Sequence, residues 1–145
     1  MASPLQQAAF NRWFKGSKLV DSEGKPLTLY HGTTKEFSAF DPKTIGSNTR
    51  VGISGKGFYF SPDPTSPNLY AELPGGRVLP VHVRLKNPRI IGPDEIIGDY
   101  GRHDGVIRIG DNGEILEVVA KSSNQVKSAI GNRGTYNRKT GDIRE

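Results

Sequence analysis

Two short stretches carry the residues best suited to chemistry. The first, Leu29–Thr34, is rich in apolar and β-branched residues and contains a His-Gly-Thr corner that begins at His31. A neutral histidine at a strand end can donate one hydrogen bond to a ligand hydroxyl while the fold fixes its other ring nitrogen. Gly32 has no Cβ, so its backbone can approach a ligand amide closely. We therefore predict a functional role for His31, although many histidines are buried only to bond the backbone.

The second stretch is Gly55–Ser61, in which two glycines alternate with other residues before the aromatic run Phe58–Phe60. Aromatic residues favour a pleated, half-buried strand, and glycine adopts backbone angles that other residues avoid. Tyr59 lies in the run, and Tyr70 follows eleven residues later. Each predicted strand thus ends in a polar or aromatic side chain, and we expect the two strands to form the walls of one cleft.

Length and composition limit the fold. The chain has 145 residues with 18 glycines and 10 prolines, which predict a single domain, 1–145, with many turns rather than a helical bundle. It has no cysteine, which excludes disulfides and thiolate catalysis. No apolar run approaches the roughly 20 residues that span a bilayer, and no signal-peptide pattern is present. A cytoplasmic protein, or one delivered into the cytoplasm of a target cell, is expected.

The net charge of +5 is concentrated in the C-terminal segment. Residues 121–145 carry six Lys or Arg and two acidic residues, a balance of +4, which leaves +1 for the remainder of the chain. Such a segment can attract a dinucleotide diphosphate, a nucleic acid or an acidic protein. A solvated surface without a ligand is at least as good an interpretation.

Helix signals open the chain. Ser3 is suited to the N-cap and Pro4 to the first helical position, so we predict a helix over Pro4–Phe14 that ends at Gly16. Trp13 is the single tryptophan of a chain that is poor in aromatic residues. We expect it to pack the helix onto the core rather than to line a binding site.

Strand signals dominate the second half. Val78–Ile91 is the longest strand-like run, in which apolar and polar residues alternate, so that one face should be buried and the other wet. Pro80 favours an edge strand or a bulge there. Gly110–Gly113 carries a hairpin turn signal between two further strand-like runs. Asn124–Ala129 is expected to open the final strand.

Together these residues resemble a known family. His31-Gly32-Thr33, the stretch Gly55–Ser61 and Tyr70 are similar to the NAD-binding core of the diphtheria-toxin-like ADP-ribosyltransferases, a clade defined by a His, a Tyr and a Glu on three strands. The chain most resembles the small ADP-ribosyltransferase domains of phage and mobile-element polyvalent proteins. These also share the lead-in Trp13–Lys18 and the late segment Asn124–Ala129. The likeness extends over about residues 10–143.

The resemblance implies a fold and an activity. The fold would be α+β, with two small, twisted antiparallel sheets around an NAD cleft and an N-terminal helix. The activity would be transfer of ADP-ribose from NAD to a protein or nucleic-acid acceptor, by a monomer that serves a phage or acts as a toxin, without contact with a membrane. No metal is implied, because the sequence has no His/Asp/Glu cluster with ligand spacing.

The resemblance also implies roles for individual residues. His31 would contact a ribose of NAD, and the backbone of Gly32 would contact nicotinamide. The rings of Tyr59 and Tyr70 would hold the flat, cationic nicotinamide between them. The neighbouring residues complete the predicted NAD-binding set: Thr33, Phe60 and Ser61.

Gln125 stands where the clade has its catalytic glutamate, so it is predicted as the third catalytic residue beside His31 and Tyr59. A glutamine keeps a hydrogen bond to ribose but lacks the charge that stabilises an oxocarbenium-like transition state. Three alternatives stay open: Gln125 positions NAD by itself, Glu114 or Glu117 supplies the charge, or the domain binds without reacting. That Gln125 is a surface amide without any role is a further interpretation.

Two rival functions also stay open. An NAD-dependent RNA 2′-phosphotransferase on the same fold would need basic side chains for the phosphate, and Lys127 and Arg133 are candidates. A non-catalytic module that binds NAD or nucleic acid would be consistent with Gln125 and with the basic segment. The choice of acceptor is expected to depend on loops such as residues 43–54, and the sequence of this loop does not indicate which acceptor it binds.

Overall fold

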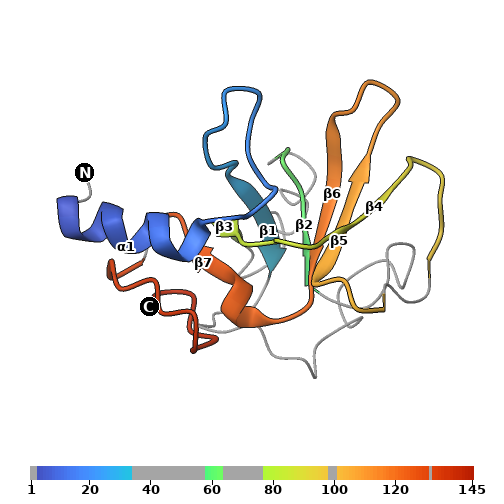
Figure 1. The fold of residues 1–145 in the computed structure, drawn as a ribbon. Coiled ribbons are helices and arrows are strands. Elements are labelled where there is room, and N and C mark those ends of the chain that lie inside the picture. The colour runs from blue at the N-terminus through green and yellow to red at the C-terminus, as the bar shows by residue number, and fades with distance from the viewer. Residues whose placement is uncertain (1–2, 34–57, 64–76, 98–100, 131) are drawn as a thin grey trace.

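Two small sheets and one α-helix make up the described part of the chain (Figure 1). The computed structural model describes residues 3–33, 58–63, 77–97, 101–130 and 132–145. The α+β class predicted from the sequence is confirmed. In chain order the elements are α1 (Pro4–Phe14), β1 (Leu29–Thr33), β2 (Phe58–Phe60), β3 (Arg77–Val83), β4 (Arg89–Ile91), β5 (Gly105–Ile109), β6 (Ile115–Ala120), the 3₁₀ turn η2 (Ser123–Gln125) and β7 (Val126–Ser128). Within these ranges, no helix is long and apolar enough to cross a membrane.

The helix α1 has the predicted bounds. Its capping box joins Ser3 and Gln6, each of which accepts a backbone hydrogen bond from the other through its side chain, and Pro4 stands in the first turn. One face of the helix is aromatic and packs against a tyrosine of the C-terminal segment. The residues of this cluster are Phe10, Trp13, Phe14 and Tyr136. The predicted packing role of Trp13, which is 2% exposed, is therefore confirmed.

The three-stranded sheet has the order β1-β3-β7, and both pairings are antiparallel. The edge position predicted from Pro80 is wrong, because β3 is the central strand. The Pro80 carbonyl accepts a hydrogen bond from the Ala129 N–H, 2.9 Å away. The backbone nitrogen of Pro80, which has no hydrogen, therefore points to the chain just after β7 ends at Ser128. The ladder between β3 and β7 has no further residue pair there, so the proline interrupts none.

The predicted run Val78–Ile91 forms parts of two strands, β3 and β4, which belong to different sheets. The expected alternation is confirmed on one face, since Val81, Val83 and Leu85 are fully buried. The other face is not simply wet, because α1 covers part of it. The His82 ring lies 5.0 Å from the Phe10 ring of α1 between centroids.

The four-stranded sheet has the order β2-β6-β5-β4 and is mixed. The predicted hairpin is confirmed: β5 and β6 pair antiparallel across a turn in which Gly113 has φ +79°. The strands β4 and β5 are parallel. Parallel neighbours cannot be joined by a tight turn, and the chain between Ile91 and Gly105 supplies the longer return. The prediction of two antiparallel sheets therefore holds for the first sheet and is wrong for the second.

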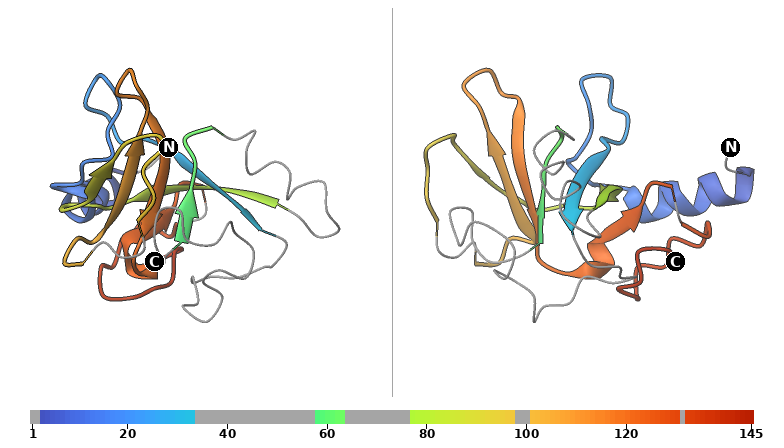
Figure 2. Two further views of the ribbon diagram at one scale, coloured as in Figure 1. Left: turned by 90° about the vertical axis from the view of Figure 1, so that its right-hand side faces the viewer. Right: turned by 180° about the vertical axis from the view of Figure 1, so that it is seen from behind.

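The two sheets meet where β1 runs beside β2. Tyr30 and Ser61 exchange both backbone hydrogen bonds, at 2.8 and 3.0 Å. The main core cluster takes side chains from both sheets, among them Leu29 of β1, Phe60 of β2 and Val118 of β6. Seen from behind, α1 and the C-terminal segment lie on one side of this junction and the four-stranded sheet lies on the other (Figure 2).

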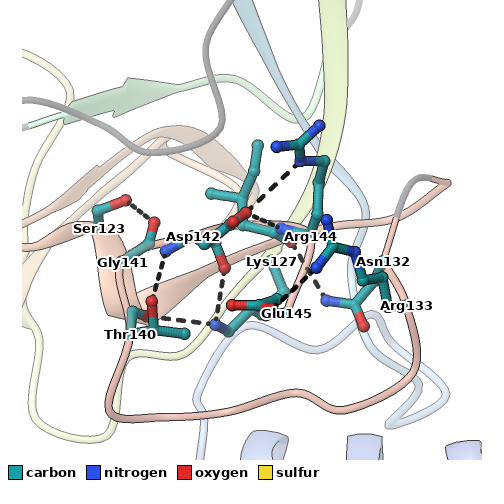
Figure 3. Close-up of polar contacts among 10 residues, drawn as sticks. Ser123, Lys127, Asn132, Arg133, Thr140, Gly141, Asp142, Arg144 and Glu145 are labelled. Carbon is teal, nitrogen blue, oxygen red and sulfur yellow. Dashed lines mark hydrogen bonds and ion pairs between the residues drawn. The ribbon is translucent and has the colours of Figure 1, made fainter.

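The C-terminal segment 132–145 is attached to β7 by polar contacts (Figure 3). Lys127 is completely buried, and its ammonium group donates to three backbone carbonyls, those of Asn137, Thr140 and Asp142, at 2.7, 3.3 and 3.1 Å. The Ser123 hydroxyl donates to the Gly141 carbonyl. One buried cation thus organises several carbonyls of a segment that has little regular structure of its own.

Candidate active site

His31 lies at the junction of β1 and β2. Its Nδ1 is 2.8 Å from the backbone carbonyl oxygen of Tyr59, and its ring is 5.4 Å from the Phe60 ring between centroids. A carbonyl oxygen can only accept a hydrogen bond, so Nδ1 carries a proton, and in the neutral ring Nε2 is an acceptor. The sequence led us to expect a ring nitrogen that donates to a ligand hydroxyl. The contact with Tyr59 reverses that expectation: Nε2 is suited to accept from a hydroxyl.

The environment of His31 favours the neutral ring. Burial lowers the pKa of His31 below its usual 6.5, and the hydrogen bond to the Tyr59 carbonyl opposes this effect without cancelling it. At neutral pH the imidazole is therefore uncharged. The uncharged ring has one protonated nitrogen, Nδ1, which donates to the Tyr59 carbonyl, and one unprotonated nitrogen, Nε2, which can accept a hydrogen bond.

We expect the fold to lose stability as the pH falls below about 6.5. Burial lowers the pKa of both His31 and His82, so below about pH 6.5 the unfolded chain binds more protons than the folded chain. The free energy of unfolding should then decrease with decreasing pH through this window. Urea denaturation at pH 7.5, 6.5 and 5.5 measures it, and the variant His31→Asn should show a weaker pH dependence. Equal stability at pH 7.5 and 5.5 would contradict the lowered pKa values.

Most of the residues predicted to bind NAD lie at the same junction. Tyr59 is half-buried and packs against the cluster that contains Val119, whereas Phe60 is 2% exposed and packs in the core between the sheets. Ser61 is joined to β1 through its backbone, and Gly32 follows His31 on β1. The backbone of Thr33 ends β1. Tyr70, the loop 43–54 and the glycines before Phe58 lie outside the described residues.

Gln125 lies elsewhere. It ends η2, just before β7, and both ends of its amide are bonded to backbone. Its Oε1 accepts from the Ser122 N–H at 2.8 Å, and its Nε2 donates to the carbonyls of Asp104 and Arg84 at 2.9 and 3.3 Å. The amide therefore joins the end of β6, the end of β3 and the start of β5. This is a set of contacts that holds the fold together.

The strand register separates Gln125 from His31. On β3, Leu79 is the partner of His31, whereas Gln125 bonds to Arg84, five residues further along the chain. Five residues of extended chain span roughly 17 Å at about 3.3 Å per residue. The structure therefore does not bring Gln125 together with His31 and Tyr59.

Glu117 of β6 lies nearer to the junction. In the pairing of β2 with β6, Tyr59 is opposite Val119 and Phe60 is opposite Val118. Residues two apart on a strand face the same side, so Glu117 shares a face with Val119 and with Tyr59. Diagonal neighbours of this kind lie roughly 7–8 Å apart. From the sequence, Glu117 was one of two carboxylates that could supply the charge in place of Gln125. The alternation of apolar and polar residues along β6 could not show which strand would pair beside Glu117.

An arginine lies beside the Glu117 carboxylate. Arg108 of β5 is the cross-strand partner of Glu117, and its Nε lies 3.9 Å from Glu117 Oε1. The Arg108 guanidinium is itself held, because Nη1 donates to the carbonyls of Gly92 and Pro93 at 2.8 and 3.1 Å. Arg108 is 6% exposed, whereas the Glu117 side chain is 27% exposed. The Glu117 carboxylate is thus paired with an arginine and still partly exposed, so a ligand can contact it.

Comparison with known proteins agrees with the motifs of the first half. A family model described as ADP-ribosyltransferase in polyvalent proteins matches residues 21–112, more than half of the 145 residues. The matched region contains His31 and Tyr59 and ends before Glu117 and Gln125. No curated protein matches the chain.

Proposed function

Since the chain belongs to the family of ADP-ribosyltransferase domains in polyvalent proteins, we propose that it transfers ADP-ribose from NAD to a macromolecular acceptor. The observation that carries this proposal is the contact of His31 on β1 with the Tyr59 carbonyl on β2, together with Glu117 of β6, which lies diagonal to Tyr59 on the same face of the four-stranded sheet. In the reaction the bond between nicotinamide and ribose C1′ breaks and a bond between C1′ and an acceptor nucleophile forms. The nucleophile loses its proton, and nicotinamide leaves.

NAD binding is assigned to the junction of β1 and β2. The Nε2 atom of neutral His31 accepts a hydrogen bond from a ribose hydroxyl, since the Tyr59 carbonyl holds the proton on Nδ1. The backbone of Gly32, next to His31, offers an N–H and a C=O to the nicotinamide carboxamide. The half-buried ring of Tyr59 provides a face for the pyridinium, with an attraction of about 1 kcal/mol when water is excluded. Tyr70 stays the predicted second face.

Glu117 is proposed to supply the negative charge. Its carboxylate, which forms a long ion pair with Arg108, accepts a hydrogen bond from a hydroxyl of the nicotinamide-side ribose and stabilises the positive charge that develops at C1′ as nicotinamide leaves. This assignment resolves the difficulty that a glutamine at the third position lacks a charge. A catalytic role for Gln125 stays a prediction, and the same assays test it.

The deciding experiment follows nicotinamide release. The protein is incubated with NAD alone and then with RNA, DNA or cell lysate, with NAD labelled in its adenosine half. Transfer predicts nicotinamide release together with label on one of the acceptors. Loss of a 2′-phosphate from RNA would instead identify a phosphotransferase, and NAD binding without nicotinamide release would identify a binding module. The acceptor class, and with it a role in a phage or as a toxin, follows from which arm is labelled.

Millimolar NAD should raise the melting temperature by several degrees. A ligand bound by the folded state alone adds RT ln(1 + [L]/Kd), about 2.7 kcal/mol at a hundredfold excess over Kd. The variant His31→Asn should lose most of this shift, because asparagine can keep a donor near the Tyr59 carbonyl but has no counterpart of Nε2.

The control for this melt is His103→Asn. The Nδ1 of His103 lies 3.1 Å from the Asn87 carbonyl, a contact like that of His31 but far from the junction of β1 and β2 in the fold. His103→Asn should keep the full NAD shift. A wild-type melting temperature that NAD leaves unchanged would contradict NAD binding at this junction.

A further inference from the structure

A cavity of about 430 Å³ lies beyond the end of β3, at the opposite end of that strand from the residues that pair with His31. Four cationic side chains line it, and they come from the end of β3, the residue after β6 and the C-terminal segment: Arg84, Lys86, Lys121 and Arg138. Ser122 and Asn124 add polar groups. Segments far apart in the sequence thus converge to form one basic cavity.

The positive charge of this cavity is largely uncompensated. Among the described residues, no ion pair joins any of its four cations to a carboxylate. Of the lining residues that the structure describes, Asp104 alone is acidic, so four positive charges and one negative charge give +3. The Asp104 carboxylate is held by the backbone N–H groups of Lys86 and Asn87, at 2.8 and 3.1 Å. The Asp104 carboxylate is therefore held in the wall of the cavity and cannot rotate to form a close ion pair with one of the cations.

The fold holds these like charges close together. Burial and the neighbouring Arg138 lower the pKa of Arg84, while Asp104 acts in the opposite direction. The Arg84 guanidinium lies over the Trp13 ring, 5.8 Å from its centroid, and so cannot readily move away. Gathering cations without partners raises the electrostatic free energy, and an anion in the cavity would lower it.

We propose that this cavity binds the phosphate groups of a nucleic-acid strand. The described residues of its lining are charged or polar, and none of them is an aromatic side chain on which a base could stack. Contacts to backbone phosphates need no such platform, and Lys and Arg supply most of them. Several cations around one cavity also suit a ligand with repeated phosphates better than a single small anion. The site is separate from the proposed NAD site, so the binding does not depend on the transferase reaction.

The test compares two triple variants of equal charge. Lys86→Gln, Lys121→Gln and Arg138→Gln together remove three exposed cations of the cavity. Arg12→Gln, Lys15→Gln and Lys139→Gln together remove three exposed cations outside it, one of them adjacent to Arg138 in the sequence. The readout is fluorescence anisotropy of labelled single-stranded DNA and RNA oligonucleotides over a series of salt concentrations.

The cavity variant should bind at least about tenfold more weakly at low salt, and the slope of log Kobs against log salt should fall in magnitude by about two, since each lost phosphate contact removes about 0.7 on a single strand. The control variant should keep its affinity within about twofold. Equal weakening of both variants would show a general attraction to net positive charge and would overturn the proposal. So would wild-type protein that binds neither oligonucleotide.

Competition separates the strand from other anions. Excess unlabelled oligonucleotide should displace the probe, whereas inorganic phosphate or NAD at the same phosphate concentration should not. Displacement by inorganic phosphate to the same degree would show a small-anion site and overturn the proposal. Polyglutamate that binds the cavity as tightly as the oligonucleotide would show an acidic-protein site and would also overturn it.

Discussion

Glu117→Gln should lower the rate of nicotinamide release by about a thousandfold, the upper range for removing one electrostatic contact from a transition state. The substitution keeps the shape and the hydrogen-bonding oxygen of the side chain and removes its charge. Because the charge matters when C1′ becomes cationic and much less in the bound ground state, kcat should fall far more than the affinity for NAD. Single-turnover assays with measured NAD binding separate the two.

The matched control is Glu114→Gln, in the turn of the same hairpin. Glu114 is exposed, and its carboxylate accepts a hydrogen bond from the Asn112 N–H, so the isosteric change should leave the rate unchanged. A full rate for Glu117→Gln would remove Glu117 from the reaction.

The variant Gln125→Ala then tests whether Gln125 has the catalytic role predicted from the sequence. If its amide serves the fold, as its bonds to the backbone of Ser122, Asp104 and Arg84 indicate, the variant should lose stability but keep the rate per folded molecule. A rate about a hundredfold lower in a fully folded protein would restore Gln125 as the catalytic residue.

Lys127→Met should lower the free energy of unfolding by about 3 kcal/mol, since about 1 kcal/mol is expected for each of the three carbonyls that loses its charged donor. Burial lowers the pKa of Lys127 to about 8, partly opposed by Asp142, so the amine is still largely protonated at pH 7. In that form it has three N–H donors for its three carbonyl partners. Methionine keeps the apolar stem and removes all three donors. Urea denaturation at pH 7 measures the difference.

The control is Lys121→Met, the same substitution at an exposed position six residues earlier. It should change the free energy of unfolding by less than about 0.5 kcal/mol. Limited proteolysis should also cleave the segment 132–145 faster in Lys127→Met than in the wild type, because the buried ammonium group ties three of its carbonyls to β7. A loss below about 1 kcal/mol, with no change in cleavage, would show that the segment is held by other contacts.

Elements with local signals could be predicted from the sequence. The capping box of α1 is formed by residues three apart, and the hairpin β5–β6 is set by its glycine turn. The short strands that carry His31 and Tyr59 lie where their β-branched and aromatic residues indicated. For the helix and the hairpin, the stabilising contacts lie within a few residues along the chain, so one window of sequence contains both partners of the interaction. For the two strands, the local preference of their residues for extended structure was the signal, and their partners lie far away in the chain.

Pairings between distant segments could not be predicted in this way. Pro80 is typical of an edge strand, yet β3 is central. The proline is tolerated there because β7 ends beside it, and no local pattern reports where another strand stops. The same holds for the parallel pairing of β4 and β5. Strand neighbours depend on which distant apolar faces bury each other, and many arrangements satisfy the same alternation.

The sequence by itself determined which residues are candidates for binding a dinucleotide: His31, the glycine after it, Tyr59 and a short set of alternatives for the third residue. The tertiary structure decided how they are used. It brought the Tyr59 carbonyl within hydrogen-bond distance of Nδ1 of His31, which keeps the proton on Nδ1 and makes Nε2 an acceptor. It set the register that brings Glu117 toward Tyr59 and leaves Gln125 among backbone groups. Hydrogen-bond roles and charge depend on what lies within a few ångströms in space, and for these residues those neighbours are far away in the chain.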